Sequence, residues 1–232
     1  QQKILRYPND SYDVGSYYKG EHLNDIWGLT TIGIAKSQEE MDAHLAKVDQ
    51  SSVGTNWGVG DIMYADLDGD GKISNGTNKL GDTGDYRIIG NSTPRFKYGI
   101  TLDAAWKGFD FSIFMQGIGK RDLWLDGCYF WGANGQGNEW QSTGFAEHWD
   151  FFRPEGDPLG ANLNSYYPRV NFSGDRNTKV QTRYLQNGAY LRLKNVQLGY
   201  TLPRVWTEKA GISSVRVYVS GDNLATITSL SK

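Results

Sequence analysis

The sequence is poor in cysteine and histidine and has no long apolar run, and each absence excludes a class of protein. With Cys128 as its single cysteine, the chain cannot form an internal disulfide, and we expect this thiol to be a small buried side chain. Three histidines in 232 residues are too few for a histidine-based metal or catalytic cluster. No apolar stretch approaches the roughly 18 residues of a transmembrane helix, so a helical membrane span is excluded.

The numbers of positive and negative residues are also nearly equal. The chain has 24 Lys and Arg residues against 26 Asp and Glu residues, for a formal net charge of −2, and it contains no long run of like charge. Because nucleic-acid-binding domains carry clustered positive charge, we expect no nucleic-acid partner. The opening Gln1-Gln2-Lys3 does not show the pattern of a signal peptide either.

Glycine and aromatic residues are abundant instead. The 29 Gly, 14 Tyr and 8 Trp residues suit turns and strands better than helices. At 232 residues the chain could be one large domain or part of something larger. We therefore expect an all-β fold.

The clearest pattern is a period-2 alternation on both sides of Lys107-Gly108. Before this turn the apolar phase consists of Phe96, Tyr98, Ile100, Leu102, Ala104 and Trp106. After it the apolar phase consists of Phe109, Phe111, Ile113 and Met115. Strict alternation indicates strands with two unlike faces, and a two-residue turn that ends in glycine predicts a tight hairpin. The expected register pairs Trp106 with Phe109, Ala104 with Phe111, Leu102 with Ile113, Ile100 with Met115, Asp103 with Ser112 and Gly99 with Gln116.

The length of this hairpin and the placement of its rings are compatible with a membrane. Each arm is about as long as the 9–11 residues that a tilted strand needs to cross a bilayer. Rings lie at both ends of the apolar face and aliphatic side chains lie in the middle, which is typical of the lipid-facing surface of an outer-membrane barrel. The alternative is one sheet of a soluble sandwich, whose apolar face covers a core.

Further elements are expected on both sides of the hairpin. The segment from Trp27 to Ala35 predicts a short strand, and a capping box at Ser37–Glu40 predicts a helix of about three turns. Two later strands are expected over Ala189–Leu202, with a bulge near Lys194-Asn195, and over the alternating residues after Val215. From Asn223 onward we expect only the beginning of a loop.

The stretch Asp66–Ser74 has the spacing of a calcium-binding loop. Candidate ligands are the side chains of Asp66, Asp68 and Asp70, the backbone carbonyl of Lys72, and Ser74, with Gly71 at the turn. Thr77 stands where a closing acid is usual, so Asp82 or Asp85 is expected to close the site, and we take Asp85 as the sixth ligand. Calcium is the expected ion, and a metal-free Asp/Gly turn is the alternative.

The segment from Lys120 to Gly188 is long, aromatic and poorly periodic, which predicts a functional or partner-facing loop. Exposed rings stack on sugars and also anchor protein interfaces, so Tyr129, Trp131 and Trp140 are candidate contacts to a ligand or partner. Internal packing of the loop is the alternative role for these rings. Glu147 and Asp150 could be proposed as a glycosidase pair, but no sequence feature fixes the separation that such chemistry needs.

Several motifs resemble one known family. They are GDIMYADLDGDGKIS, RIIGNSTPRFKYGITLDAAWKGFDFSIFMQG, YPRV, YLQNGAYLRLKNVQLGYTLP and GISSVRVYVSGDNL. In this order, from about Trp27 to Leu224, they resemble the C-terminal part of a SusC/RagA-like TonB-dependent transporter. The resemblance implies that residues 1–232 form part of a plugged transmembrane β-barrel of about 22 strands in the bacterial outer membrane. The plug, the TonB-box region, most strands and the final strand would lie outside this chain.

The resemblance also implies a function and a set of partners. Such proteins import glycans or peptides with energy from the TonB complex, and a SusD/RagB-like surface lipoprotein acts as their lid. Residues 61–92 would form a calcium-type loop, and residues 120–188 would form a long extracellular loop. Outer-membrane lipid and an oligosaccharide or peptide ligand are the other expected partners, and no enzymatic activity is expected. The alternative is a secreted, calcium-stabilised carbohydrate-binding β-sandwich module.

Overall fold

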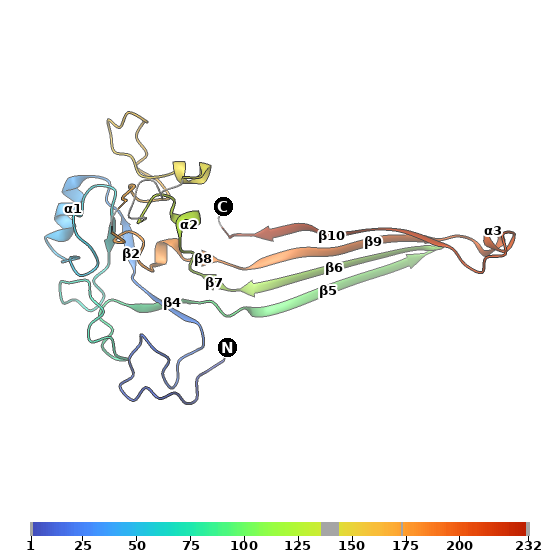
Figure 1. Cartoon of the computed structure of the whole chain (residues 1–232), viewed down its shortest axis with the longest axis horizontal. Helices are drawn as coiled ribbons and strands as arrows, with labels where there is room; N and C mark the ends of the chain where they lie inside the picture. The colour runs from blue at the N-terminus through green and yellow to red at the C-terminus, as the bar shows by residue number, and fades with distance from the viewer. Residues whose placement is uncertain (1, 136–143, 173, 231–232) are drawn as a thin grey trace. The chain divides into compact units, whose positions relative to one another are not determined.

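The computed structural model describes residues 2–135, 144–172 and 174–230, which divide into two compact units (Figure 1). The loop unit comprises the described residues of Gln1–Thr93 and Leu123–Gln186. The strand unit comprises the described residues of Pro94–Asp122 and Asn187–Ser231.

The strand unit is a four-stranded antiparallel sheet with the order β10-β9-β6-β5. Its strands are β5 (Arg95–Trp106), β6 (Phe109–Lys120), β9 (Tyr190–Thr201) and β10 (Arg216–Thr228). The turn between β5 and β6 and the connection between β9 and β10, which carries helix α3 (Arg204–Glu208), lie at the same end of the sheet (Figure 1). The segment that joins β6 to β9 therefore leaves and re-enters the sheet at the opposite end.

The predicted hairpin register is confirmed at every pair that was expected. The pairs include Trp106 with Phe109, Leu102 with Ile113, and Asp103 with Ser112. Lys107 and Gly108 both have positive φ angles, 47° and 89°. Two successive residues of this kind form the turn that matches the twist of the flanking strands, so the Lys107-Gly108 turn fixes the register.

The predicted bulge in β9 is also confirmed. Phe114 and Met115 are adjacent in β6, but they pair with Asn195 and Leu193, so Lys194 is an extra residue in β9. The extra residue changes the phase of the alternation. As a result Leu193 lies on the same face as Val196, although the two differ in sequence phase.

The expectation of a loop from Asn223 onward is wrong, because β10 continues to Thr228. Opposite Lys194, β10 carries two unpaired residues, Asn223 and Leu224, before Ala225 resumes pairing. Asn223 has a φ of 53° and its side-chain oxygen accepts a hydrogen bond from Lys194 Nζ at 2.9 Å. This wide bulge interrupts the alternation, which is why the sequence pattern suggested an early end.

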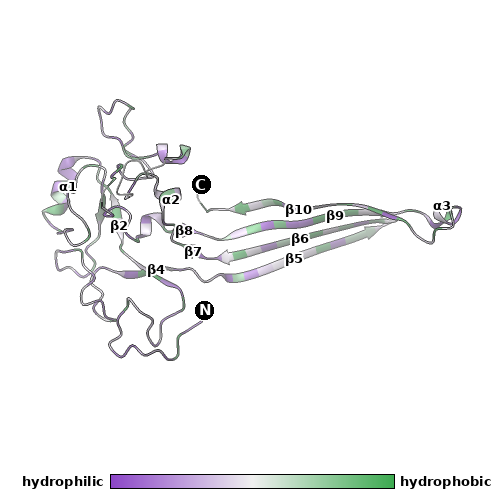
Figure 2. Ribbon diagram, viewed as in Figure 1, coloured by the Kyte–Doolittle hydropathy of each residue, from purple (hydrophilic) through white to green (hydrophobic). Residues whose placement is uncertain are grey.

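Hydrophobic and hydrophilic residues are interspersed along the four strands (Figure 2). The register places them on one apolar face and one largely polar face. By register, the apolar face carries Tyr98, Ile100, Leu102, Ala104, Trp106, Phe109, Phe111, Ile113, Met115, Leu191, Leu193, Val196, Leu198, Tyr200, Val217, Val219, Ala225 and Ile227. On the opposite face Arg216 Nε donates to Asp110 Oδ1 at 2.9 Å, and this pair passes over Gly199 of the strand between them. A Cβ atom at Gly199 would lie 2.6 Å from both side chains, so any larger residue there would force this ion pair to shift.

The loop unit contains small sheets. β1 (Asp25–Gly28) pairs with β4 (Arg87–Asn91), and β2 (Thr31–Ile34) pairs with β3 (Ile62–Tyr64). Apart from these two sheets, β7 (Asp122–Leu123) and β8 (Gln186–Asn187) pair with each other. The single strand expected over Trp27–Ala35 is wrong, because its two halves pair with different partners and the chain bends away between them, where Leu29 N donates to Val180 O.

The helix expected after Ser37 is present as α1 (Gln38–Leu45). Ser37 Oγ accepts from Glu40 N at 3.2 Å, as the capping box predicts. The Glu40 side chain accepts from Lys36 N at 2.7 Å and not from Ser37 N, so the second bond of the box is shifted by one residue. The helix is eight residues long, about two turns and not three, and Val48 lies beyond its end, where it packs against the main core. Among the described residues no helix is long and apolar enough to cross a membrane.

The core of the loop unit is rich in rings from the aromatic segment. Its short helices are α2 (Cys128–Trp131), η2 (Ala146–Trp149) and η3 (Thr182–Tyr184). The buried core residues are Leu29, Ile34, Val53, Ile62, Tyr64, Ile73, Phe130, Trp131, Phe152, Tyr167 and Tyr184. Cys128 is only partly buried, contrary to expectation, since Phe130 and Trp131 take the inward positions of α2.

Candidate functional site

The fold of the Asp66–Ser74 loop is stabilised by hydrogen bonds from its backbone amides to its own carboxylates. Asp66 accepts backbone hydrogen bonds from Gly69 at 2.6 Å and from Gly71 at 2.9 Å. Asp68 and Asp70 each accept from the amide two residues further on, at 3.1 and 2.8 Å. Gly69 and Gly71 have φ angles of 80° and 78°, a region that side chains rarely adopt, so the sequence can turn tightly at both points.

Asp85 approaches this loop from eleven residues beyond Ser74. Its buried carboxylate accepts from Leu67 N at 2.6 Å and from Ser74 N at 2.9 Å. One oxygen each from Asp66, Asp68 and Asp85 lie within 4.8 Å of one another. Such a group of oxygen donors suits a hard cation such as Ca²⁺.

The remaining predicted ligands, Asp70, Lys72 and Ser74, make hydrogen bonds within the loop and its next turn. Among the described residues, the group of three acids does not include Asp70. The Lys72 amide donates to Asp70, and Ser74 Oγ accepts from Gly76 N at 3.1 Å. Asp82, the alternative closing acid, accepts from Thr77 Oγ1 at 2.7 Å and so stabilises the next turn. The structure thus brings together three of the four predicted carboxylates, those of Asp66, Asp68 and Asp85.

The acids in this group differ in their electrostatic environment. Hydrogen bonds from the amides of Gly71 and Gly69 hold the pKa of Asp66 below its usual value. For Asp68, the hydrogen bond from the Asp70 amide lowers the pKa, but desolvation and the neighbouring carboxylates of Asp85, Asp70 and Asp66 raise it by more. A cation would relieve this repulsion, because an opposite charge favours the ionised form of each acid.

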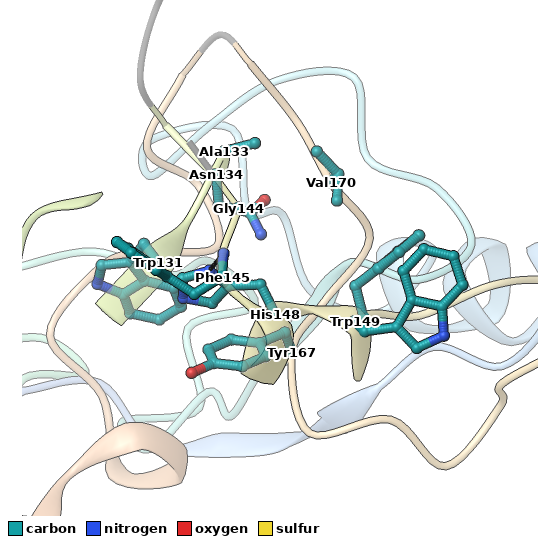
Figure 3. Close-up of a pocket in the computed structure, with 10 residues that line it drawn as sticks. Trp131, Ala133, Asn134, Gly144, Phe145, His148, Trp149, Tyr167 and Val170 are labelled. Atoms are coloured by element: carbon teal, nitrogen blue, oxygen red, sulfur yellow. Dashed lines mark hydrogen bonds between the residues drawn. The ribbon is translucent and has the colours of Figure 1, made fainter. Parts of the chain in front are cut away.

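A second candidate site is an aromatic pocket of about 260 Å³ in the loop unit (Figure 3). It is lined by Trp131, Ala133, Asn134, Gly144, Phe145, His148, Trp149, Phe151, Tyr167 and Val170. His148 Nδ1 accepts from Phe145 N at 3.0 Å while Nε2 faces Phe130 O at 3.1 Å, so the neutral ring carries its proton on Nε2. Burial, followed by the nearby Tyr166, Glu147 and Asp150, raises the pKa of Tyr167 to about 12.

The three predicted contact residues, Tyr129, Trp131 and Trp140, differ in their exposure to solvent or lie outside the described residues. Tyr129 is 82% exposed and its ring stacks on Phe145 with centroids 5.8 Å apart, so it is available to a partner. Trp131 is only 2% exposed and packs in the core, although it also borders the pocket. Trp140 lies outside the described residues. Of the glycosidase pair, Asp150 accepts a hydrogen bond from Asn162 Nδ2 at 2.9 Å, which ties the loop together.

A buried charge network escaped the sequence reasoning. Asp61 is fully buried and its two oxygens accept from Arg169 Nε at 2.7 Å and Nη2 at 2.6 Å. Arg176 Nε lies 3.4 Å from the same carboxylate, and Asn177 Nδ2 donates to it at 2.8 Å. These residues are more than 100 positions from Asp61, so no local pattern reveals the pairing. Asp61 and Arg169 do occur within the motifs GDIM and YPRV.

Two curated proteins are similar in sequence to this chain. TonB-dependent receptor P3 of Formosa agariphila is 35% identical over 170 residues, which are 73% of this chain and 15% of the relative. TonB-dependent receptor P26 of the same organism is 30% identical over 208 residues, which are 88% of this chain and 18% of the relative. The chain thus spans less than a fifth of the length of these relatives. No protein-family model matches the chain.

Solved structures show the same fold. The RagAB peptide transporter matches with a TM-score of 0.58 and 21% identity over 97% of this chain and 21% of that chain. The RagAB peptide importer in its open-open state matches with a TM-score of 0.58 and 19% identity over 96% of this chain and 20% of that chain. The antiparallel strands described above are therefore part of a transmembrane β-barrel, and the soluble sandwich is set aside. The chain belongs to the TonB-dependent receptors, and the SusC/RagA-like resemblance of its motifs is confirmed.

Proposed function

We propose that the chain is part of an outer-membrane importer that takes up glycans or peptides. In this proposal the TonB complex supplies the energy through parts of the protein outside this chain, and a SusD/RagB-like lipoprotein covers the extracellular opening. The supporting observation is the two-faced sheet of β5, β6, β9 and β10, together with relatives that are named as receptors and not as enzymes. We assign no catalytic role to the chain.

The apolar face of the sheet would contact outer-membrane lipid. Leu102 and Val217 on this face are 55% and 63% exposed, which suits a hydrocarbon environment. The opposite face, with Asp103, Ser112 and the pair of Asp110 and Arg216, would line the interior of the barrel. Charged groups in the interior remain hydrated or paired, so they do not oppose membrane insertion.

The direction of the sheet in the membrane follows from its connections. Short turns of such barrels are periplasmic and long loops are extracellular. The Lys107-Gly108 turn and the β9–β10 connection would then be periplasmic. The long segment between β6 and β9 would be extracellular, where its exposed Tyr129 could meet the lid or an incoming ligand.

We further propose that Asp66, Asp68 and Asp85 bind one structural calcium ion. Their oxygens lie close together, and the backbone hydrogen bonds to all three carboxylates hold the loop in place. Calcium sites on extracellular modules bind at about 10⁻⁴–10⁻³ M. An ion near its dissociation constant contributes RT ln 2, about 0.4 kcal/mol, so calcium would order the loop without stabilising the barrel greatly.

Uptake by cells tests the import function most simply. The full-length gene is deleted, and uptake of fluorescent oligosaccharide and peptide mixtures is measured with TonB active or inactive. We expect the deletion to abolish uptake of one of the two classes, and the loss of TonB to have the same effect. Unchanged uptake of both classes, or recovery of the protein among soluble proteins, would contradict the proposal.

A further inference from the structure

The tyrosine-rich segment before β1 encloses a hollow that belongs to neither candidate site. Its volume is about 610 Å³, which lies within the usual range of about 300–1,000 Å³ for small-ligand sites. The hollow is lined by Arg6, Tyr7, Pro8, Asn9, Asp10, Tyr12 and Lys19. None of these residues belongs to a strand or helix, so the shape of the hollow depends on side-chain hydrogen bonds.

Asn9 supplies most of these bonds. Its amide group donates to Asp13 O at 2.8 Å and to Tyr17 O at 3.0 Å, and its oxygen accepts from Asp13 N at 3.1 Å. Asp13 in turn accepts from Asn78 Nδ2 at 2.7 Å, which attaches the segment to a distant part of the loop unit. The wall of the hollow is therefore preorganised, and a ligand would not have to order it.

Each of the two tyrosines in the wall packs against another tyrosine ring. Tyr7 and Tyr12 are 41% and 40% exposed. The ring of Tyr7 meets Tyr17 edge-on at 5.6 Å, and the ring of Tyr12 packs on Tyr18 at 6.4 Å. Tyr12 has a φ of 54°, an uncommon conformation for a bulky residue, and strain of this kind clusters at ligand sites. Leu80 N donates to Tyr12 O at 2.9 Å and helps to fix it.

The charges around the hollow are not neutralised by the protein. Arg6 and Lys19 are exposed, and within residues 2–135, 144–172 and 174–230 neither side chain has an ion-pair or hydrogen-bond partner. Asp10 is the single acid among the lining residues. Two cations against one carboxylate leave a net positive charge that favours anionic ligands.

We propose that this hollow binds an oligosaccharide that carries carboxylate or sulfate groups. The apolar face of a sugar ring would pack on Tyr7 or Tyr12, and its acidic groups would pair with Arg6 and Lys19. Asp10 would accept hydrogen bonds from sugar hydroxyls. A sugar fits better than an acidic peptide, because two exposed tyrosine rings lie beside the two cations and offer a surface on which a sugar ring can pack. The assignment specifies the ligand class of the proposed importer, but binding can be measured without transport.

The test uses full-length protein in detergent and isothermal titration calorimetry. The probes are tetragalacturonate and a sulfated galactose tetrasaccharide, with neutral galactotetraose and tetraglutamate as controls. We expect at least one anionic sugar to bind, neither control to match it, and affinity to fall with added salt. The double variant R6Q/K19Q should bind this sugar at least about tenfold more weakly, because charge pairing is lost.

Two further variants separate binding from folding. Asparagine tolerates positive φ, so Tyr12→Asn removes the ring while keeping the backbone, and it should also weaken binding. Lys47→Gln, which changes an exposed lysine elsewhere in the loop unit, should leave binding unchanged. The inference is overturned if neither anionic sugar binds, if tetraglutamate binds equally well, or if R6Q/K19Q binds like the wild type. Binding without any uptake in cells would instead contradict the import function alone.

Discussion

At the scale of single residues, the calcium-type loop depends on an acid that the motif alone does not supply. The spacing of Asp66, Asp68 and Asp70 indicated the loop, but the closing acid lay beyond a stretch with no regular pattern. Asp85 reaches the group because its carboxylate accepts from Leu67 N and Ser74 N, on both sides of the loop. The spacing of the acids left both Asp82 and Asp85 as candidates for the closing ligand. The fold distinguishes them, because Asp85 bonds to the loop whereas Asp82 bonds to Thr77 in the next turn.

Replacing Asp85 by asparagine should abolish calcium protection of this loop. The variant loses a negative charge and one of two buried acceptors, which costs about 1–3 kcal/mol locally. We expect protease cutting near Gly71 to become independent of calcium in D85N, whereas calcium slows cutting of the wild type. Limited proteolysis with calcium or with a chelator measures this. D82N is the matched control and should keep the calcium effect; the same loss in D82N would show that Asp85 has no special role.

The aromatic segment shows where the sequence left two roles open, contact with a partner and internal packing. Without periodicity, no sequence rule separates Tyr129, which is exposed, from Trp131, which is buried two residues later. The difference arises from helix α2, whose inward positions contact the core rings Tyr167 and Tyr184. The partner-contact prediction therefore remains for Tyr129 and is replaced by a packing role for Trp131.

A pair of variants tests this division. Tyr129→Ala combined with Phe145→Ala should reduce lid binding or uptake while leaving the protein folded, because both rings are exposed. Trp131→Ala should instead destabilise the loop unit by about 3–5 kcal/mol, since it empties a core position. Thermal unfolding in detergent and a lid-binding assay measure the two effects. Normal lid binding and normal uptake in the Tyr129→Ala and Phe145→Ala double variant would show that these two rings do not contact a partner or ligand.

At the scale of elements, the strands were predictable to different degrees. The β5–β6 hairpin was predicted down to its register, because strict alternation and a two-residue turn leave few alternatives. The bulge at Lys194 was predictable from a change of phase within one strand. The end of β10 was not, since the two extra residues Asn223 and Leu224 erase the alternation, and pairing with β9 is what restores the strand. The sequence also did not show that β1 and β2 pair with separate strands, because the partners β4 and β3 come later in the chain and no local pattern identifies them.

Substitutions on the two faces of β5 should differ sharply in cost. Leu102 lies on the apolar face and Asp103 on the opposite one. Replacing Leu102 by arginine near mid-membrane should cost about 2–4 kcal/mol, because a charge then faces hydrocarbon, whereas Asp103→Asn should cost little. Urea titration of the full-length protein in lipid vesicles compares the two. Equal tolerance at both positions would mean that the faces have been assigned wrongly.

At the scale of the whole molecule, the relatives and the sheet support each other. The relatives show the family to which the chain belongs. The sheet explains how this part of the chain can lie in a membrane, because one of its faces is apolar. Edge strands β5 and β10 have only one neighbour each among the described residues. Further strands of a longer protein would pair with them, since a barrel leaves no edge open in lipid. Sequence motifs carried the family assignment, whereas the Asp61 network could not be predicted, because its partners lie more than 100 positions away. The hollow near Arg6 could not be predicted either, because it lies in an irregular segment without a periodic pattern.

The central claim is that one face of this sheet meets lipid and the other does not. Spin labels on single cysteines test it through collisions with oxygen and with a water-soluble nickel complex. The cysteines are introduced along β5 into full-length protein in vesicles, after Cys128 and any cysteine outside this chain have been replaced by serine. Labels at Tyr98, Ile100, Leu102 and Ala104 should collide mainly with oxygen, which concentrates in lipid. Labels at Gly99, Thr101 and Asp103 should show a lower ratio of oxygen to nickel collisions. A ratio that fails to alternate along β5, or that alternates with the opposite phase, would contradict the claim.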